Sequence, residues 1–118
     1  MSKQQLDAIL EMMAHNHPPE NATPNMMRAW VEEANSHTPV AENVQVQRIN
    51  CGPCDGDLLL PAGGDASRLI IYYHGGGFFF CSSRTHRVTA SNLARAAGCA
   101  VLVPDYRLAP EHPRSGRA

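Results

Sequence analysis

Apolar residues recur at helical spacing twice within the first 40 residues. The two stripes are Leu6, Ile9, Leu10 and Met13, and Met26, Met27, Trp30, Val31 and Ala34. Ser2 followed by Gln5 has the pattern of a capping box, and Thr23 followed by Pro24 is a second helix start signal. The pattern predicts two short amphipathic helices. Because their polar faces are not basic, we expect the apolar faces to pack on the rest of the chain rather than on a membrane or a partner helix.

From residue 44 the apolar positions change to the period of a strand. Alternation over residues 44–49 predicts a half-exposed antiparallel strand, and residues 58–60 a short second strand. The continuous apolar run at residues 69–73 is typical of a strand covered on both faces. A helical pattern over residues 85–97 ends at Gly98, and residues 99–103 form another buried strand. Strand, helix and strand in this order predict a βαβ unit with parallel strands.

The composition is that of a folded globular protein, with 43% apolar and 18% charged residues. A formal net charge of −1 offers no electrostatic case for binding nucleic acid or an anionic membrane. No apolar run is long enough to span a bilayer, and no signal-peptide segment follows Met1. We therefore expect a cytoplasmic protein with reduced cysteines and no membrane span.

The strand at residues 69–73 leads into the run His74-Gly75-Gly76-Gly77-Phe78. Ligands of α/β sheets sit beyond the carboxyl ends of the strands, which is where this run begins. Three adjacent glycines have no side chains to block the backbone, so their N–H groups can point into a site and hold a developing negative charge. The position and the residue types predict an oxyanion hole.

Three stretches carry a resemblance to a known family: His74-Gly75-Gly76-Gly77-Phe78, Ser83-Arg84-Thr85-His86, and residues 105–113. They resemble the hormone-sensitive-lipase-like family of α/β-hydrolase esterases. The resemblance is specific over residues 69–113 and looser over the N-terminal helices, which are similar to part of that family's cap. It implies an α/β fold, the N-terminal part of an α/β-hydrolase, with cap helices at residues 1–40 and a truncated core at residues 41–118. It also implies hydrolysis of small-molecule carboxylic esters without a cofactor.

The resemblance also implies roles for single residues. Gly76 and Gly77 would supply N–H groups to the oxyanion hole, and Gly75 would permit the tight turn. His74 would orient the loop and is not the family's catalytic base. Residues 105–113 would be structural, with Arg107 and Glu111 as ion-pair partners that shape a loop.

Aromatic residues follow the glycines, and two interpretations of them are open. Phe78 and Phe79, with Phe80, either line an acyl pocket as substrate-binding residues or pack under the cap. The residue types do not separate the two, because pockets of this kind are largely apolar.

The family's nucleophile sits in a G-x-S-x-G elbow on a later strand, followed by an acid and a histidine. Residues 1–118 contain no such elbow. After Pro113 the family pattern would continue into an apolar helix, whereas this chain reads Arg114-Ser115-Gly116-Arg117-Ala118. We therefore expect a truncated chain that lacks the catalytic triad and is inactive alone. A non-catalytic fragment that interacts with a full-length hydrolase is the alternative.

Truncation would also affect the sheet. In the family's sheet the strand before His74 is central, and its next partner carries the nucleophile. In this chain that edge would be bare and apolar, and a bare apolar edge is a template for pairing with another chain. The sequence therefore predicts self-association through an uncovered sheet edge.

Cys51-Gly52-Pro53-Cys54 has the letters of the thioredoxin redox motif. That chemistry needs the first cysteine at a helix N-terminus, whereas two acids and a glycine follow here, so we favour a loop between two strands over a thiol redox protein. A zinc site that combines Cys51 and Cys54 with His15 and His17 is disfavoured, because the histidine spacing is not that of a zinc finger.

Overall fold

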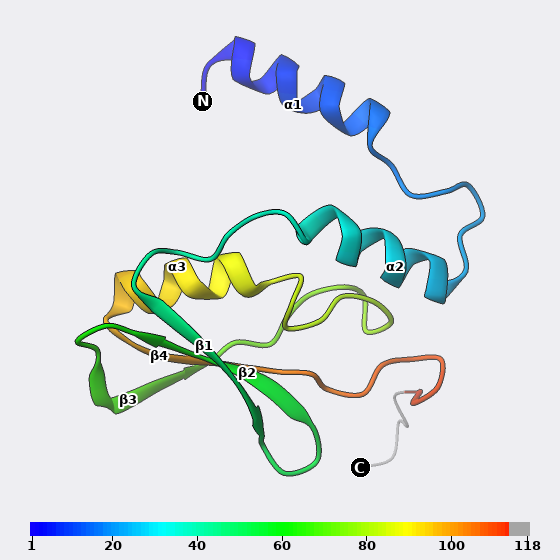
Figure 1. Cartoon of the computed structure of the whole chain (residues 1–118). Coiled ribbons are helices and arrows are strands. Elements are labelled where there is room, and N and C mark those ends of the chain that lie inside the picture. Colours follow the sequence, from blue (N-terminus) through cyan, green and yellow to red (C-terminus); the bar gives the residue numbers. More distant parts are fainter. Residues whose placement is uncertain (114–118) are drawn as a thin grey trace.

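The computed structural model describes residues 1–113 (Figure 1). The chain from Arg114 on, where the expected departure from the family pattern occurs, lies outside the described residues. The elements in order are α1 (Lys3–His15), α2 (Pro24–Asn35), β1 (Val44–Asn50), β2 (Asp55–Pro61), β3 (Asp65–Ile71), α3 (Arg87–Ala97) and β4 (Cys99–Pro104). Every predicted element is present, and the differences lie at the ends of β2, β3 and α3.

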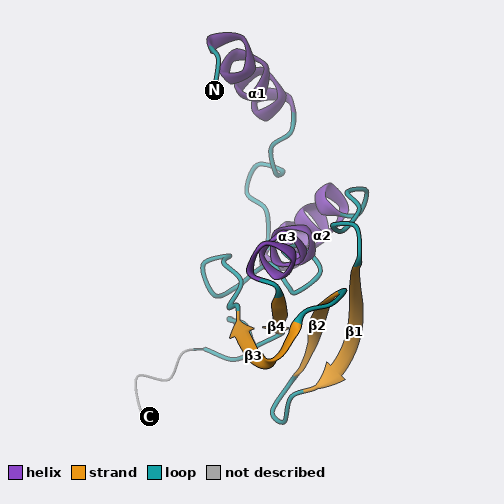
Figure 2. Cartoon of the chain, turned by 90° about the vertical axis from the view of Figure 1, so that its left-hand side faces the viewer, coloured by secondary structure: helices purple, strands orange, loops and turns teal. Residues whose placement is uncertain are grey.

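The four strands form one mixed sheet in the order β1-β2-β4-β3 (Figure 2). β1 pairs antiparallel with β2, from Val44↔Pro61 to Asn50↔Asp55. β2 is also antiparallel to β4, and β4 lies parallel to β3. Since α3 connects the two parallel strands, both the antiparallel pair and the βαβ unit are confirmed.

The core lies between α3 and the face of the sheet that α3 covers. Leu59, Val101 and Val103 of the strands are fully buried, as are Ala90 and Ala94, which share one face of α3. Complete burial of each large side chain contributes about 1.5–3 kcal/mol. α3 ends at Gly98, as predicted. Gly98 has a left-handed backbone conformation (φ 64°, ψ 31°), which glycine adopts without steric cost.

The expectation that the strand before His74 is covered on both faces is wrong. Leu69 and Ile71 are 53% and 51% exposed, whereas Ile70 between them packs on the core. α3 is the only helix of residues 1–113 that contacts the sheet, and it covers one face. β3 also stands at an end of the sheet, so its outer edge has no partner strand among the described residues. An apolar run shows that both faces suit burial, but the covering layer must come from elsewhere in the chain.

Both N-terminal helices begin where the capping signals predict. Ser2 Oγ accepts from Gln5 N at 3.2 Å, and the Gln5 side chain accepts from Ser2 N at 2.8 Å, which completes the capping box. Thr23 Oγ1 accepts from Met26 N at 3.2 Å, with Pro24 in the first turn of α2.

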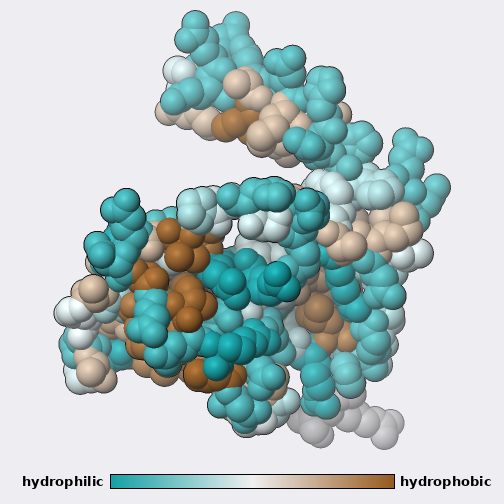
Figure 3. Space-filling view, viewed as in Figure 1, coloured by the Kyte–Doolittle hydropathy of each residue, from teal (hydrophilic) through white to brown (hydrophobic). Residues whose placement is uncertain are grey.

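The two helices differ in how they meet the rest of the molecule. α1 has no buried residue and contacts no other element of the described chain, so the expectation that its apolar face packs on the chain is wrong. Apolar side chains line its underside in Figure 3, and Leu10 and Met13 are 54% and 59% exposed. The radius of gyration is accordingly 16.4 Å, against about 13.5 Å for a compact chain of this length. α2 is held to the loops below it by polar side chains.

None of the described helices combines the length and the apolar character needed to cross a membrane.

Candidate functional site

His74 is the buried anchor of the glycine loop that follows β3. It is only 3% exposed, and its ring stacks on Tyr106 with centroids 4.3 Å apart and an interplanar angle of 14°. The Tyr106 hydroxyl donates to the His74 carbonyl at 2.5 Å. His74 Nδ1 lies 2.8 Å from the Gly75 carbonyl, so this nitrogen carries the proton and donates it. These contacts hold the first turn of the loop.

Bonds to two carbonyls determine where the next two N–H groups point. In a trans peptide the C=O group and the following N–H group point in opposite directions. The Gly75 carbonyl is held by His74, and the Gly76 carbonyl accepts from Phe79 N and Phe80 N, both at 3.2 Å. The N–H groups of Gly76 and Gly77 therefore point away from these contacts. Neither donates to an acceptor within residues 1–113. Such successive free N–H groups suit an anionic ligand.

The backbone of this loop is strained in a way that requires glycine at one position. Gly76 has φ +126°, and a Cβ atom there would lie 2.1 Å from the Phe80 carbonyl oxygen. Gly77 follows in the left-handed region at φ +60°. Phe78 and Cys81 also have positive φ values, 65° and 72°. For non-glycine residues this costs about 1–2 kcal/mol each, and strain of this kind clusters at functional sites.

The segment after β4 brackets the loop. Ser83, near the end of the loop, donates from its N–H and its Oγ to the Asp105 carboxylate at 2.7 and 2.9 Å. Ala109 N donates to the Phe78 carbonyl in the middle of the loop at 2.8 Å. With the Tyr106 contacts at the start, the segment holds the loop at three points.

Arg28 of α2 is a residue that sequence reasoning missed. Its Nε donates to the Phe79 carbonyl and its Nη2 to the Ala109 carbonyl, both at 2.7 Å. Its two terminal nitrogens also bind the Glu111 carboxylate at 2.9 Å each, and Arg28 lowers the pKa of Glu111 to about 2. The expected pairing of Glu111 with Arg107 is therefore wrong, because the rigid Arg28 fork takes both carboxylate oxygens. Arg28 lies beside the apolar stripe of this helix and not within it, so the periodicity gave no signal for its role.

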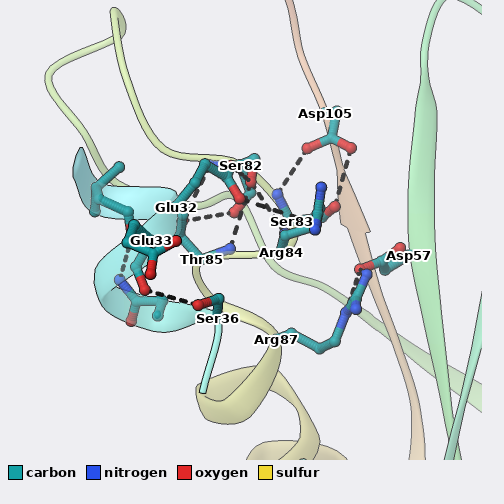
Figure 4. A network of polar contacts seen from close by, with 12 residues as sticks. Glu32, Glu33, Ser36, Asp57, Ser82, Ser83, Arg84, Thr85, Arg87 and Asp105 are labelled. Carbon is teal, nitrogen blue, oxygen red and sulfur yellow. Dashed lines mark hydrogen bonds and ion pairs between the residues drawn. The ribbon is translucent and has the colours of Figure 1, made fainter. Parts of the chain in front are cut away.

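A network of carboxylates, arginines and serines lies beside the far end of the loop (Figure 4). Asp57 is fully buried and pairs with Arg87 at 2.8 Å and with Arg48 at 3.3 Å. Arg48 also reaches Asp105 at 2.5 Å and Ser83 Oγ at 3.0 Å. Burial alone would raise the pKa of Asp105, but the bonds from Ser83 and Arg48 outweigh burial, and the pKa is lowered. The network ties the loop to β1, β2 and the end of β4.

His86 completes the histidine pair behind the loop. Its ring centroid is 5.7 Å from that of His74, and Thr85 Oγ1 lies 2.9 Å from its Nδ1. Burial, and next the neighbouring His74, lower the pKa of His86. His86 is therefore neutral at pH 7.

The serine hydroxyls near the site are already engaged. Ser82 Oγ donates to Glu32 of α2, and the buried Ser83 hydroxyl binds Asp105 (Figure 4). Ser67 Oγ donates to Asp65 at 2.6 Å in β3. Within residues 1–113 no serine hydroxyl bonds to a histidine, so the described chain contains no assembled serine–histidine pair.

The two phenylalanines of the predicted substrate site have different surroundings. Phe78 is 63% exposed and lines a pocket of about 330 Å³ with Arg107, Ala109 and His112. Phe79 is half-buried, and its ring lies 4.7 Å from that of Phe80 while its carbonyl binds α2. The geometry thus associates Phe78 with a pocket and Phe79 with α2.

Cys51 and Cys54 lie in the loop between β1 and β2, as the sequence predicts. Both are free thiols, and no helix begins at Cys51. Burial, and next the Cys51 side chain, raise the pKa of Cys54. A thioredoxin-type site requires the opposite, a thiol at a helix N-terminus. Among the residues that the structure describes, no three His, Cys, Asp or Glu side chains gather in a metal-binding arrangement.

A protein-family model described as the alpha/beta hydrolase fold matches residues 70–116, which include the glycine loop, α3 and β4. Together with the mixed sheet and its βαβ unit, this match shows that the chain is the N-terminal part of an α/β-hydrolase fold.

Three solved structures are similar to this chain over nearly its whole length. An esterase from the bacterial hormone-sensitive lipase family is 33% identical, with a TM-score of 0.85 over 97% of this chain and 38% of that one. A hormone-sensitive lipase from a metagenome library is 29% identical, with a TM-score of 0.85 over 97% of this chain and 38% of that one. An esterase/lipase from an uncultured bacterium is also 29% identical, with a TM-score of 0.85 over 96% and 39%. No curated protein matches the chain.

The chain therefore has the α/β-hydrolase fold and is similar, over nearly its whole length, to structures described as esterases or lipases of the bacterial hormone-sensitive lipase family. It spans 38% of the length of the first of these structures.

Proposed function

We propose that this chain contributes the oxyanion hole of a serine-type carboxylic ester hydrolase, with the N–H groups of Gly76 and Gly77 as donors. The observation that carries the proposal is the orientation of these two groups, which are turned outwards by the bonded carbonyls of Gly75 and Gly76 and have no acceptor in the described chain. Their place beyond the carboxyl end of β3 supports a ligand site. The similarity to esterases supports the reaction class.

The proposed chemistry uses charge that develops during the reaction. When a nucleophile attacks an ester carbonyl, negative charge moves to the carbonyl oxygen, and each correctly placed N–H donor contributes about 3–4 kcal/mol to the transition state. In the complete enzyme a serine would attack, and water would hydrolyse the acyl-enzyme. The residues of this chain act by positioning, because Tyr106 and His74 hold one end of the loop and Arg28 holds Phe79.

We assign the apolar part of the ester to the pocket beside Phe78, with Phe79 as its neighbour toward the cap. The pocket, with a volume of about 330 Å³, is lined by Phe78, Ala109, Arg107 and His112. This volume is at the low end of the range for small-molecule sites, and it therefore favours short esters.

An anion titration of the chain itself tests the oxyanion hole. We expect methylphosphonate, a tetrahedral anion, to shift the amide proton resonances of Gly76 and Gly77 saturably. The Gly76→Ala variant should lose the response, because its Cβ has no room beside Phe80. Gly75→Ala is the matched control, since nothing lies within 4 Å of a Cβ there. Equal shifts in both variants, or none in the native chain, would reject the assignment of the donors.

Two turnover measurements test the reaction class. We expect the purified chain to hydrolyse a short p-nitrophenyl ester no faster than buffer, and turnover that a serine-directed phosphonate abolishes would contradict this. A chimera of residues 1–113 with the remaining C-terminal part of the 33% identical esterase should hydrolyse the same ester. In that chimera Gly76→Ala should lower kcat by about 10²–10³, and Gly75→Ala should not. A folded chimera that binds methylphosphonate but has no activity would separate the anion site from the hydrolase proposal.

A further inference from the structure

Cys51 and Cys54 face each other across the end of the β1–β2 hairpin. The last paired residues of the two strands are Asn50 and Asp55, and the cysteines are one step further on each strand. Cys51 N donates to the Cys54 carbonyl at 2.9 Å, so the two backbones remain in register. Directly opposed residues of an antiparallel pair have Cα atoms about 4.5–5.5 Å apart, within the range of roughly 4.4–6.8 Å that a disulfide requires.

We propose that Cys51 and Cys54 are a reversible dithiol–disulfide clasp, a modification site that closes the hairpin when the chain meets a disulfide oxidant such as oxidised glutathione. One thiolate attacks the oxidant and releases one glutathione thiol, and the second thiolate then displaces the other. Two protein thiols lose two electrons and two protons, one S–S bond forms, and one molecule of oxidised glutathione becomes two of the reduced form.

The surroundings of the four cysteines single out this pair. Cys51 and Cys54 are both partly exposed free thiols, so an oxidant reaches them. Cys99 is 3% exposed within β4 and is shielded from reagents in solution. Burial raises the pKa of Cys81 just as it raises that of Cys54, so the pKa does not separate these two thiols. What distinguishes Cys54 is the second cysteine, Cys51, opposite it in the hairpin. The Cys51 side chain adjoins that of Cys54 closely enough to influence its pKa, which agrees with the backbone geometry.

The clasp lies one hydrogen bond away from the segment that holds the glycine loop. The Asp55 carbonyl, next to Cys54, accepts from Asp105 N at 2.8 Å. The Asp105 carboxylate in turn binds Ser83 at the end of the loop. Closing the clasp therefore restricts the end of the hairpin on which Asp105 rests.

Equilibration of the chain in glutathione buffers tests the clasp. We expect a product that has lost the mass of two hydrogen atoms, with the disulfide mapped to the peptide that contains residues 51–54. The ratio of oxidised to reduced protein should follow [GSSG]/[GSH]², whereas a single mixed disulfide follows [GSSG]/[GSH]. Cys51→Ser and Cys54→Ser should abolish this product, and Cys81→Ser is the matched control that should retain it. Phenylarsine oxide, which bridges close thiol pairs, should bind the reduced native chain and the control only.

Two results would overturn the proposal. The first is accumulation of glutathione adducts at Cys51 or Cys54 in place of the internal disulfide. The second is a disulfide that maps to any other cysteine pair. The link to the loop has its own readout, because oxidation should slow hydrogen exchange at the Asp105 amide roughly tenfold in the native chain and not in Cys54→Ser. Unchanged exchange at Asp105 after complete oxidation would refute that link.

Discussion

Replacing Gly76 by alanine is the sharpest test of the loop geometry. The added Cβ would lie 2.1 Å from the Phe80 oxygen and 2.8 Å from the Phe80 carbonyl carbon, both backbone atoms that cannot rotate away. Even without this clash, the backbone of an alanine at position 76 would be strained, because φ there is +126°. Relieving the clash requires the loop to open and to give up the two bonds that the Gly76 carbonyl accepts from Phe79 N and Phe80 N.

The expected loss of folding stability is the sum of the backbone strain and the two lost hydrogen bonds. Backbone strain of this kind costs about 1–3 kcal/mol, and two lost backbone hydrogen bonds add about 1 kcal/mol each. The total of roughly 3–5 kcal/mol is a large fraction of the stability of a domain, typically about 5–15 kcal/mol. At about 4 °C per kcal/mol, Gly76→Ala should lower the melting temperature by roughly 10–20 °C.

Gly75→Ala is the matched control within the same run of glycines. No atom lies within 4 Å of its Cβ position, and its φ is not positive. Its stability should stay within about 1 kcal/mol of the native chain, because a compatible Gly→Ala change mainly restricts the unfolded state. Thermal and urea unfolding followed by circular dichroism measure both variants. Equal melting temperatures for the two variants would show that Gly76 is not packed as described.

Three further changes probe the contacts around the loop. Arg28→Met should remove the bonds from α2 to the Phe79 and Ala109 carbonyls, while the Ser82–Glu32 contact remains. It should also return the pKa of Glu111, measured by carboxyl NMR, from about 2 to the usual value near 4.5, whereas an unchanged pKa would contradict the pairing. Because the folded-state pKa of Glu111 is depressed, the stabilisation from this pair is complete above the usual carboxyl pKa and is lost as pH falls toward 2. Tyr106→Phe keeps the ring on His74 but removes the 2.5 Å bond to its carbonyl, at a cost of about 1–2 kcal/mol. Faster amide exchange in the loop but not in β2 would support this, and uniform exchange would oppose it. Ile71→Lys on the bare β3 edge should reduce self-association in sedimentation velocity, unlike Gln45→Lys on β1, and a monomeric native chain would refute the edge model.

The secondary structure could be predicted well because its signals are local. The capping pairs Ser2–Gln5 and Thr23–Met26 join residues three apart, and Gly98 ends α3 by its own backbone preference. The Cys51–Cys54 loop was likewise predictable from short-range turn chemistry. The position of the glycine run at the carboxyl end of a strand followed from the order of the elements.

The contacts that hold the candidate site could not be predicted in the same way. Arg28 and Glu111 are 83 residues apart, and Ser83 and Asp105 are 22 apart. Any carboxylate in the chain could pair with a given arginine, depending on the fold. Nearness in sequence therefore suggested Arg107 as the partner of Glu111, and this choice was wrong.

The sequence by itself determined the elements, their order and the residue types that the glycine loop requires, because these depend on backbone preferences and on periodicity over a few residues. Only the tertiary structure decided which face of β3 is covered, that α1 stands apart, and that Arg28 and Tyr106 hold the loop. It also decided the direction of the Gly76 and Gly77 N–H groups. Burial and long-range hydrogen bonds depend on which distant segments meet, and many pairings satisfy the same local pattern.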